Sequence, residues 1–156
     1  MKYIAWLFTM SKSLTFQSLN KTPNSIEAEI AVLGGLIIDN EAWEQIADIL
    51  TVNDFYNQEH RKIYSCIVSL VDENTPFDVV TINEKINTSN DKSFSTYLSE
   101  IINQTPSAAN IKAYANIVRE QSILRQLISV SNILIEKSRD GGIDSKALLD
   151  EADKNI

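Results

Sequence analysis

Residues 103–120 read NQTPSAANIKAYANIVRE, and this stretch decides the fold. Thr105 is a favourable helix N-cap, Pro106 suits the first helical position, and the helical pattern then continues to about Ser138. Residues 140–142, DGG, supply a stop signal. At about 1.5 Å per residue, such a helix extends roughly 45 Å, which is longer than a compact domain of this size needs.

The apolar residues of this helix are too numerous for one stripe. One predicted stripe contains Ile111, Tyr114/Ala115, Val118, Gln121/Arg125, Ile128 and Ile135, and an adjacent one contains Ile117, Leu124, Leu127, Ser131 and Leu134. One interpretation is a single wide face that is buried in an ordinary bundle. The other is one stripe for a hairpin partner and one for a second chain. Periodicity alone does not choose between them.

The sequence before the long helix is also helical in pattern, and no strand alternation of useful length interrupts it. Asn24 and Glu27 have capping-box spacing, and Asn40 and Asn57 are predicted to cap later helices. Gly34-Gly35 within the first helix costs about 1 kcal/mol per glycine relative to alanine, which is tolerated where another backbone comes close. We therefore expect this helix to be central and tightly packed.

These patterns predict an all-α chain with three regions. Residues 1–22 form a disordered leader, residues 23–106 form a compact multi-helix head, and residues 107–156 form a long antiparallel helical hairpin. The apolar run near the N-terminus, residues 3–10, is too short to span a membrane. The single cysteine, Cys66, rules out an internal disulfide framework and suits the reducing cytoplasm.

Charge and motif content argue against nucleic-acid binding and against catalysis. The 21 acidic residues outnumber the 14 basic ones, giving a formal net charge of −7, which opposes phosphate binding by this chain's own field. No Gly-rich phosphate loop is present. His60 is the only histidine and is predicted to be partly exposed with a local role, whereas Cys66 is predicted to be a small core residue. Glu27 and Glu29 are interpreted as solvated carboxylates or as helix-start charges, rather than as acid/base partners. We expect no unaided catalysis.

Four blocks in fixed order carry a family resemblance: PNSIEAEIAVLGGLIIDNEAWEQIADIL, DFYNQEHRKIY, PFDVVTI and NQTPSAANIKAYANIVRE. Together they resemble the N-terminal domain of the bacterial replicative DNA helicase, the DnaB family, over about residues 23–156. The resemblance implies a non-catalytic collar domain, with ATP and Mg²⁺ bound only in an ATPase domain outside the matched region and no cofactor or metal here. The full-length protein would be an ATP-dependent 5′–3′ helicase.

The resemblance also implies partners. The domain would dimerise through the hairpin, as part of a trimer of dimers in a full-length ring, and would dock primase; a helicase loader is a further candidate partner, and DNA would be met only through the ring. The residues expected in the dimer interface are Tyr114, Val118, Gln121, Leu124, Arg125 and Ile128. The residues expected in primase docking are Glu27, Tyr97, Ile128 and Leu134.

Two other functions stay open from the sequence. A nucleic-acid-binding helical domain predicts salt-sensitive DNA affinity, which the net charge of −7 opposes. A metal-free helical enzyme, or a regulator unrelated to replication, predicts a polar concave pocket with converging titratable groups, of which the sequence gives no sign.

Overall fold

The computed structural model describes residues 21–86, 92–140, 144–147 and 150. Its elements, in chain order, are the α-helix α2 (Ile26–Ile38), the 3-10 helices η2 (Asn40–Gln45) and η3 (Val52–Asp54), and the α-helices α3 (Gln58–Asp72), α4 (Val79–Ile86), α5 (Lys92–Gln104) and α6 (Ile111–Arg139). No strand occurs in these described ranges, and the all-α prediction is confirmed. Apart from residues 21 and 22, the predicted leader lies outside the described residues.

Helix α2 is the centre of the head, as its glycine pair predicts. It packs against α3, α5, α6 and η2, and most of its side chains are buried. A Cβ on Gly34 would lie 2.1 Å from Thr105 Oγ1 and 3.0 Å from the Ile101 carbonyl oxygen. Such approaches are shorter than van der Waals contact, so only glycine allows the end of α5 to lie directly on α2.

Two of the predicted helix caps are wrong by one residue. Ser25, not Asn24, caps α2 and accepts a hydrogen bond from the Ala28 backbone N–H. Asp39 caps η2, while Asn40 reaches across the head, accepting from the Phe77 N–H and donating to the Phe77 carbonyl, both at 2.9 Å. A short polar side chain can hydrogen-bond either to the backbone at a helix end or to the backbone of a distant loop, and sequence spacing does not distinguish the two.

The predicted start of the long helix is also wrong. Thr105 is 5% exposed and its hydroxyl donates to the Ile101 carbonyl at 2.9 Å, so it closes α5 rather than capping α6. Helix α6 begins at Ile111, with Asn110 at the cap position, and it ends at Arg139, close to the predicted end. Its 29 residues extend about 44 Å at the usual helical rise.

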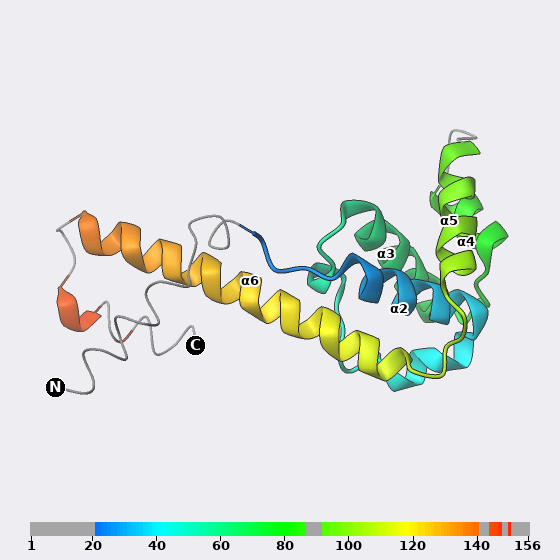
Figure 1. Cartoon of the computed structure of the whole chain (residues 1–156), viewed down its shortest axis with the longest axis horizontal. Helices are drawn as coiled ribbons and strands as arrows, with labels where there is room; N and C mark the ends of the chain where they lie inside the picture. Colours follow the sequence, from blue (N-terminus) through cyan, green and yellow to red (C-terminus); the bar gives the residue numbers. More distant parts are fainter. Residues whose placement is uncertain (1–20, 87–91, 141–143, 148–149, 151–156) are drawn as a thin grey trace, which may run out of the picture.

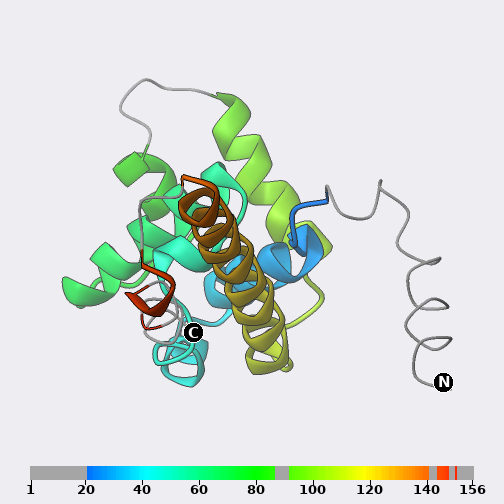
Figure 2. The same ribbon diagram turned by 90° about the vertical axis from the view of Figure 1, so that its left-hand side faces the viewer.

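Helix α6 lies only partly on the head. Its buried residues are Ile111, Ala115, Val118 and Ser122, all within the first three to four turns. Beyond Ser122 the helix leaves the head as a rod, with α2–α5 gathered at the other end of the molecule (Figure 1). Seen along the helix from its far end, the head lies behind α6 (Figure 2). We call residues 111–122 the proximal part and residues 123–139 the distal part.

The predicted hairpin is only half visible. Its first arm is α6, but its second arm lies largely outside the described residues. The part of the second arm that is described, residues 145–147 and Asp150, is helical. The division between residues 106 and 107 stays a prediction, although the proximal part of α6 completes the head's core. In the described part of the chain, no helix is both long and apolar enough to cross a bilayer.

Candidate functional site

The outer side of α6 carries most of the exposed apolar surface of the described chain. Of its ten exposed large hydrophobic side chains, seven lie on α6: Ile117, Ile123, Leu124, Leu127, Ile128, Ile133 and Ile135. Single exposed apolar residues are normal on a protein surface, but a concentration on one projecting helix marks an interaction site. The surface of α6 is therefore the main candidate for binding another protein.

Four of these side chains form a seam of regular spacing. Ile117, Leu124, Ile128 and Ile135 are separated by seven, four and seven residues, which places them along one face of a helix. The buried residues Ile111, Ala115, Val118 and Ser122 also recur at helical spacing, but on a different face. We call the first set the outer seam. A heptad-like apolar seam is the pattern by which one helix packs along another.

The first predicted stripe does not lie on one face. Ile111 and Val118 point into the head, whereas Ile128 and Ile135 are both 48% exposed. The predicted stripe joins positions that differ by more than a quarter turn around the helix axis. Its spacings do not match 3.6 residues per turn, and the mismatch adds up along a helix of 29 residues. Ile117 and Leu124, from the second predicted stripe, belong with Ile128 and Ile135.

Five of the six predicted dimer residues divide into three groups. Leu124 and Ile128 are exposed on or along the outer seam, at 37% and 48%. Tyr114 and Gln121 are half-buried. Val118 is 1% exposed in the core of its own chain, which argues against a direct contact with a second chain, and its place in the dimer interface stays a prediction.

Arg125, also predicted to contact a second subunit, is bound to its own head. Its guanidinium donates to the Pro23 carbonyl at 2.9 Å and to the Asp54 carbonyl, and it lies 5.7 Å from the centre of the Tyr56 ring. Burial lowers the pKa of Arg125, although the neighbouring Glu29 charge opposes this effect. These contacts hold the point where α6 leaves the head.

A second set of contacts holds the proximal part of α6 to η3. Arg119 Nη1 lies 2.7 Å from Asp54 Oδ1, and Asp54 Oδ2 accepts from the Thr51 N–H at 2.7 Å. Burial opposes ionisation of Asp54, but hydrogen bonds from Ser122, Thr51 and Arg119 together hold its pKa below its ordinary value. Asp54 is therefore a charged clamp between the head and α6.

The four predicted primase residues do not form one surface within a chain. Glu27 is exposed in the first turn of α2, and Tyr97 is half-buried on α5. Ile128 and Leu134 belong to the distal part of α6. In Figure 1, α5 and the distal part of α6 lie at opposite ends of the molecule. A partner that touches both must bridge that distance or contact two chains.

Tyr97 is held by a buried network that the sequence did not predict. Its hydroxyl lies 2.6 Å from His60 Nε2, and His60 Nδ1 lies 2.6 Å from Glu29 Oε2. The Glu29 carboxylate also accepts from the Tyr56 N–H at 2.6 Å. The pKa of Tyr97 is raised, first by burial and then by the Glu29 charge. The network joins α2, α3 and α5.

The predicted partial exposure of His60 is wrong, because this side chain is 0% exposed. Glu29 is 1% exposed, so it is not solvated, but it lies in the first turn of α2, as its interpretation as a helix-start charge predicts. A buried carboxylate needs partners for its oxygens, and His60, Tyr56 and Asn57 supply them. The partners lie 27 to 37 residues apart in the chain, so local spacing gave no signal. Cys66 is buried, as predicted.

Tyr97 also lines a surface cavity of about 390 Å³, together with Phe94 and Ser93 from α5 and Glu59 and Lys62 from α3. The cavity gives the network a connection to the surface. Within the described ranges, no group of three or more His, Cys, Asp or Glu residues is arranged to hold a metal ion.

Comparison with known proteins then places the chain. The family model described as the DnaB-like helicase N terminal domain matches residues 21–120. The chain belongs to this family. It is 42% identical over 138 residues to the replicative DNA helicase DnaB of Haemophilus influenzae, and 36% identical over 144 residues to that of Buchnera aphidicola. These alignments cover 86% and 90% of the chain.

The chain spans about 30% of the length of these curated DnaB relatives. The matched part is the N-terminal, non-catalytic domain of the helicase. Among solved structures, the fold is similar to the N-terminal domain of the Mycobacterium tuberculosis DnaB helicase, with a TM-score of 0.79, 29% identity and coverage of 87% of this chain and 98% of the other.

A further DnaB structure is that of the N-terminal domain of the Helicobacter pylori helicase, described together with its interactions with primase. It has a TM-score of 0.64 and 25% identity, and covers 72% of this chain and 90% of the other. The recognition of the DnaB family from four sequence blocks is therefore confirmed.

Proposed function

We propose that this chain is the assembly and docking domain of a replicative DNA helicase. In this proposal it forms a dimer through the outer seam of α6, and three such dimers form the collar of a full-length hexameric ring. The observation that carries the proposal is the seam itself: Ile117, Leu124, Ile128 and Ile135 are each 37% exposed or more. Burying apolar surface of this kind is the main favourable term in association.

The seam's geometry supports a second copy of the same helix as its occupant. Symmetric pairs bury the same patch on both subunits, and a straight projecting rod with an apolar face allows such a pairing. Gln121 and Ser131 lie between the apolar positions of the seam and make it less hydrophobic than a protein core. An interface of this composition suits a dimer that depends on neighbouring domains for full strength.

Activities of the full-length protein enter as part of the same proposal. The ring would unwind DNA in the 5′–3′ direction, with ATP and Mg²⁺ bound in an ATPase domain and DNA contacted only through the assembled ring. The protein would act in the cytoplasm, where a helicase loader is a further candidate partner.

Primase docking would use two separate patches. One contains Glu27 and Tyr97 at the head, and the other contains Ile128 and Leu134 on the distal part of α6. Because these patches lie apart within one chain, a bound primase domain would bridge the head of one subunit and the α6 of another. The H. pylori structure supports a primase partner for that relative.

Light scattering over a range of concentrations tests the assembly proposal. Leu124→Asp and Ile128→Asp should each shift the chain from dimer to monomer, because a carboxylate would be placed in the apolar seam, while circular dichroism stays unchanged. Val80→Asp is the matched control, since Val80 is 62% exposed on α4, away from the seam. Association that survives both seam variants would contradict the proposal.

Co-elution with the C-terminal domain of primase tests docking. The unmodified chain should co-elute, and Glu27→Lys or Leu134→Asp should reduce the bound fraction. If both variants bind as the unmodified chain does, primase uses a different surface. Leu124→Asp, which lies outside the proposed primase patches, should also weaken primase binding if the bound primase bridges two chains.

A further inference from the structure

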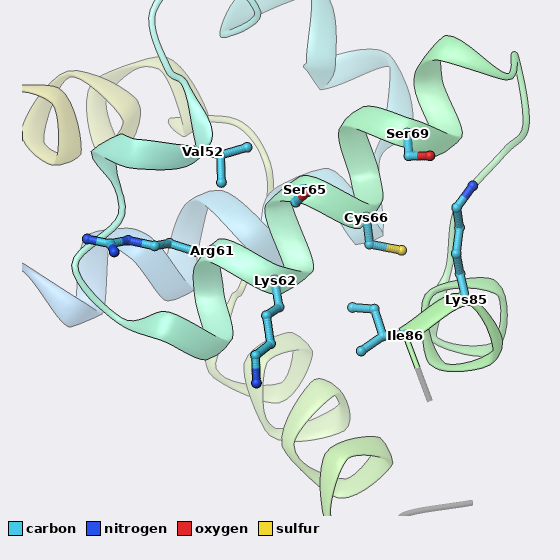
Figure 3. A pocket seen from close by; sticks show the side chains of 8 residues that line it. All are labelled: Val52, Arg61, Lys62, Ser65, Cys66, Ser69, Lys85 and Ile86. Atoms are coloured by element: carbon cyan, nitrogen blue, oxygen red, sulfur yellow. The ribbon is translucent and has the colours of Figure 1, made fainter. Parts of the chain in front are cut away.

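A groove between α3 and α4 is not used by the proposed assembly surfaces. It has a volume of about 520 Å³ and is lined by Val52, Arg61, Lys62, Ser65, Cys66, Ser69, Lys85 and Ile86. Cys66 and Ile86 face each other across the space between the two helices, and Val52 lies at one edge (Figure 3). This volume is within the range of grooves that bind ligands or peptide side chains.

The charge of the groove differs from that of the whole chain. Every charged side chain that lines it is a cation, namely Arg61, Lys62 and Lys85. The chain as a whole has a formal net charge of −7. With Glu59 and Glu73, the partners of Lys62 and Lys85, counted, the rim keeps one net positive charge around the apolar side chains of the groove. Such a rim favours a ligand that combines negative charge with an apolar group.

The cations can exchange their present partners at little cost. Lys62 Nζ lies 2.7 Å from Glu59, and Lys85 Nζ lies 2.5 Å from Glu73. Both pairs are partly or largely exposed, and exposed ion pairs contribute little to stability. Arg61 donates Nε to the Phe55 carbonyl at 2.6 Å, which fixes its side chain and leaves other guanidinium donors for a ligand.

We propose that this α3–α4 groove binds an acidic peptide segment of a partner protein, with an apolar side chain of that segment seated between Cys66 and Ile86. The carboxylates of the segment would pair with Lys62, Lys85 and Arg61. Three cations beside apolar residues fit a short peptide better than a nucleic-acid backbone, because phosphate binding needs a wider basic surface and the overall charge opposes it. This proposal is independent of the α6 dimer, and its groove is separate from the cavity beside Tyr97, although Lys62 lines both.

Methyl and amide NMR of the full chain tests the proposal, with an acetylated probe peptide of alternating Glu-Asp-Leu units. The peptide should shift the methyl signals of Val52 and Ile86 and the amide signals of Ser65 and Ser69. Two control peptides should each bind at least about tenfold more weakly: one with Leu replaced by Ser, and one with Glu and Asp replaced by Gln and Asn.

Charge variants then locate the site. Lys62→Glu combined with Lys85→Glu should weaken peptide binding about tenfold, since each exposed pair contributes up to a few-fold in affinity. Lys112→Glu, on the exposed side of α6, should leave it unchanged. Absence of shifts at Val52 and Ile86, or equal binding of either control peptide, would overturn the proposal. So would an oligothymidylate strand that shifts the same signals more strongly than the peptide.

Discussion

The proximal and distal parts of α6 have similar side chains but different surroundings. Both carry branched apolar residues at helical spacing. In the proximal part, Ile111, Ala115 and Val118 are 0%, 0% and 1% exposed, whereas in the distal part Ile128 and Ile135 are both 48% exposed. The helix continues without a break between them. Apolar content therefore does not determine burial here; contact with the head does, since Ile117 in the proximal part faces away from the head and is 43% exposed.

This contrast assigns a separate role to each part. The proximal part contributes to the free energy of unfolding of the head, because its side chains pack against α2, η2 and η3. Apart from Arg125, the distal part adds little to the head and presents an apolar surface to other molecules. A charged substitution should therefore cost much more stability at the buried positions of the proximal part than at the exposed positions of the distal part.

The largest expected effect comes from introducing a charge in each part. Val118→Asp places a carboxylate in the core and should lower the free energy of unfolding by about 4 kcal/mol or more. Leu124→Asp, less than two turns later, should change it by less than about 0.5 kcal/mol. Urea unfolding of the dissociated monomers measures both. Similar losses for the two variants would remove the distinction between the parts.

Substitutions at the two glycines of α2 test the close contact between α2 and the end of α5. Gly34→Ala should cost about 2 kcal/mol, because the new Cβ meets the Thr105 side chain and the Ile101 carbonyl at 2.1 and 3.0 Å. Gly35→Ala is the matched control. Its Cβ meets the flexible end of Ile111 at 3.2 Å, which can move aside. Thermal unfolding should give a clearly lower midpoint for Gly34→Ala than for Gly35→Ala.

Arg125 marks the boundary between the two parts and separates two interpretations of its role. If it holds α6 to the head, Arg125→Ala should lower the free energy of unfolding by about 1.5 kcal/mol, because the contacts to Pro23, Asp54 and Tyr56 are lost. If it serves the dimer, as the sequence analysis predicted, the variant should instead weaken association. Lys112→Ala, at an exposed position of the same helix outside the predicted interface, is the control. Unfolding and light scattering on the same samples decide between the two.

The sequence was sufficient where the signal was local. The glycine pair predicted the close approach to α2, Asn57 predicted the cap of α3, and the DGG stop lies just after the observed end of α6. The two helix-end signals act within a few residues, whereas the glycine pair indicates that a backbone comes close but not which one. The all-α class follows from such signals added along the chain.

The sequence was insufficient where distant residues compete for one group. Thr105 has the chemistry of an N-cap, but packing on Gly34 gives it a different role. His60 and Glu29 look like surface residues until α2 and α3 meet, 31 residues apart. The first predicted stripe of α6 combined buried and exposed positions for a related reason, since only the position of the head shows which face of the helix is covered. The predicted dimer and primase residues stay predictions.

The smallest expected effect is an acid-dependent loosening of the proximal part. The folded-state pKa of Asp54 is below its ordinary value of 3.8, so the ionised carboxylate stabilises the folded state above that value. The contribution is lost as the pH falls from there through the lowered pKa, when protonation removes the charge that faces Arg119. Asp54→Asn should therefore be less stable than the unmodified chain at neutral pH, and the difference should shrink at acid pH.

Urea unfolding of the two proteins between neutral pH and about pH 3 measures this difference. Asp48→Asn, at an exposed position, is the control for a general loss of negative charge. A difference that stays constant with pH would show that Asp54 acts by hydrogen bonding alone, without its charge. A difference that shrinks would show that the attachment of the proximal part depends on an ionised group. In that case the boundary between the two parts of α6 is set by charge as well as by packing.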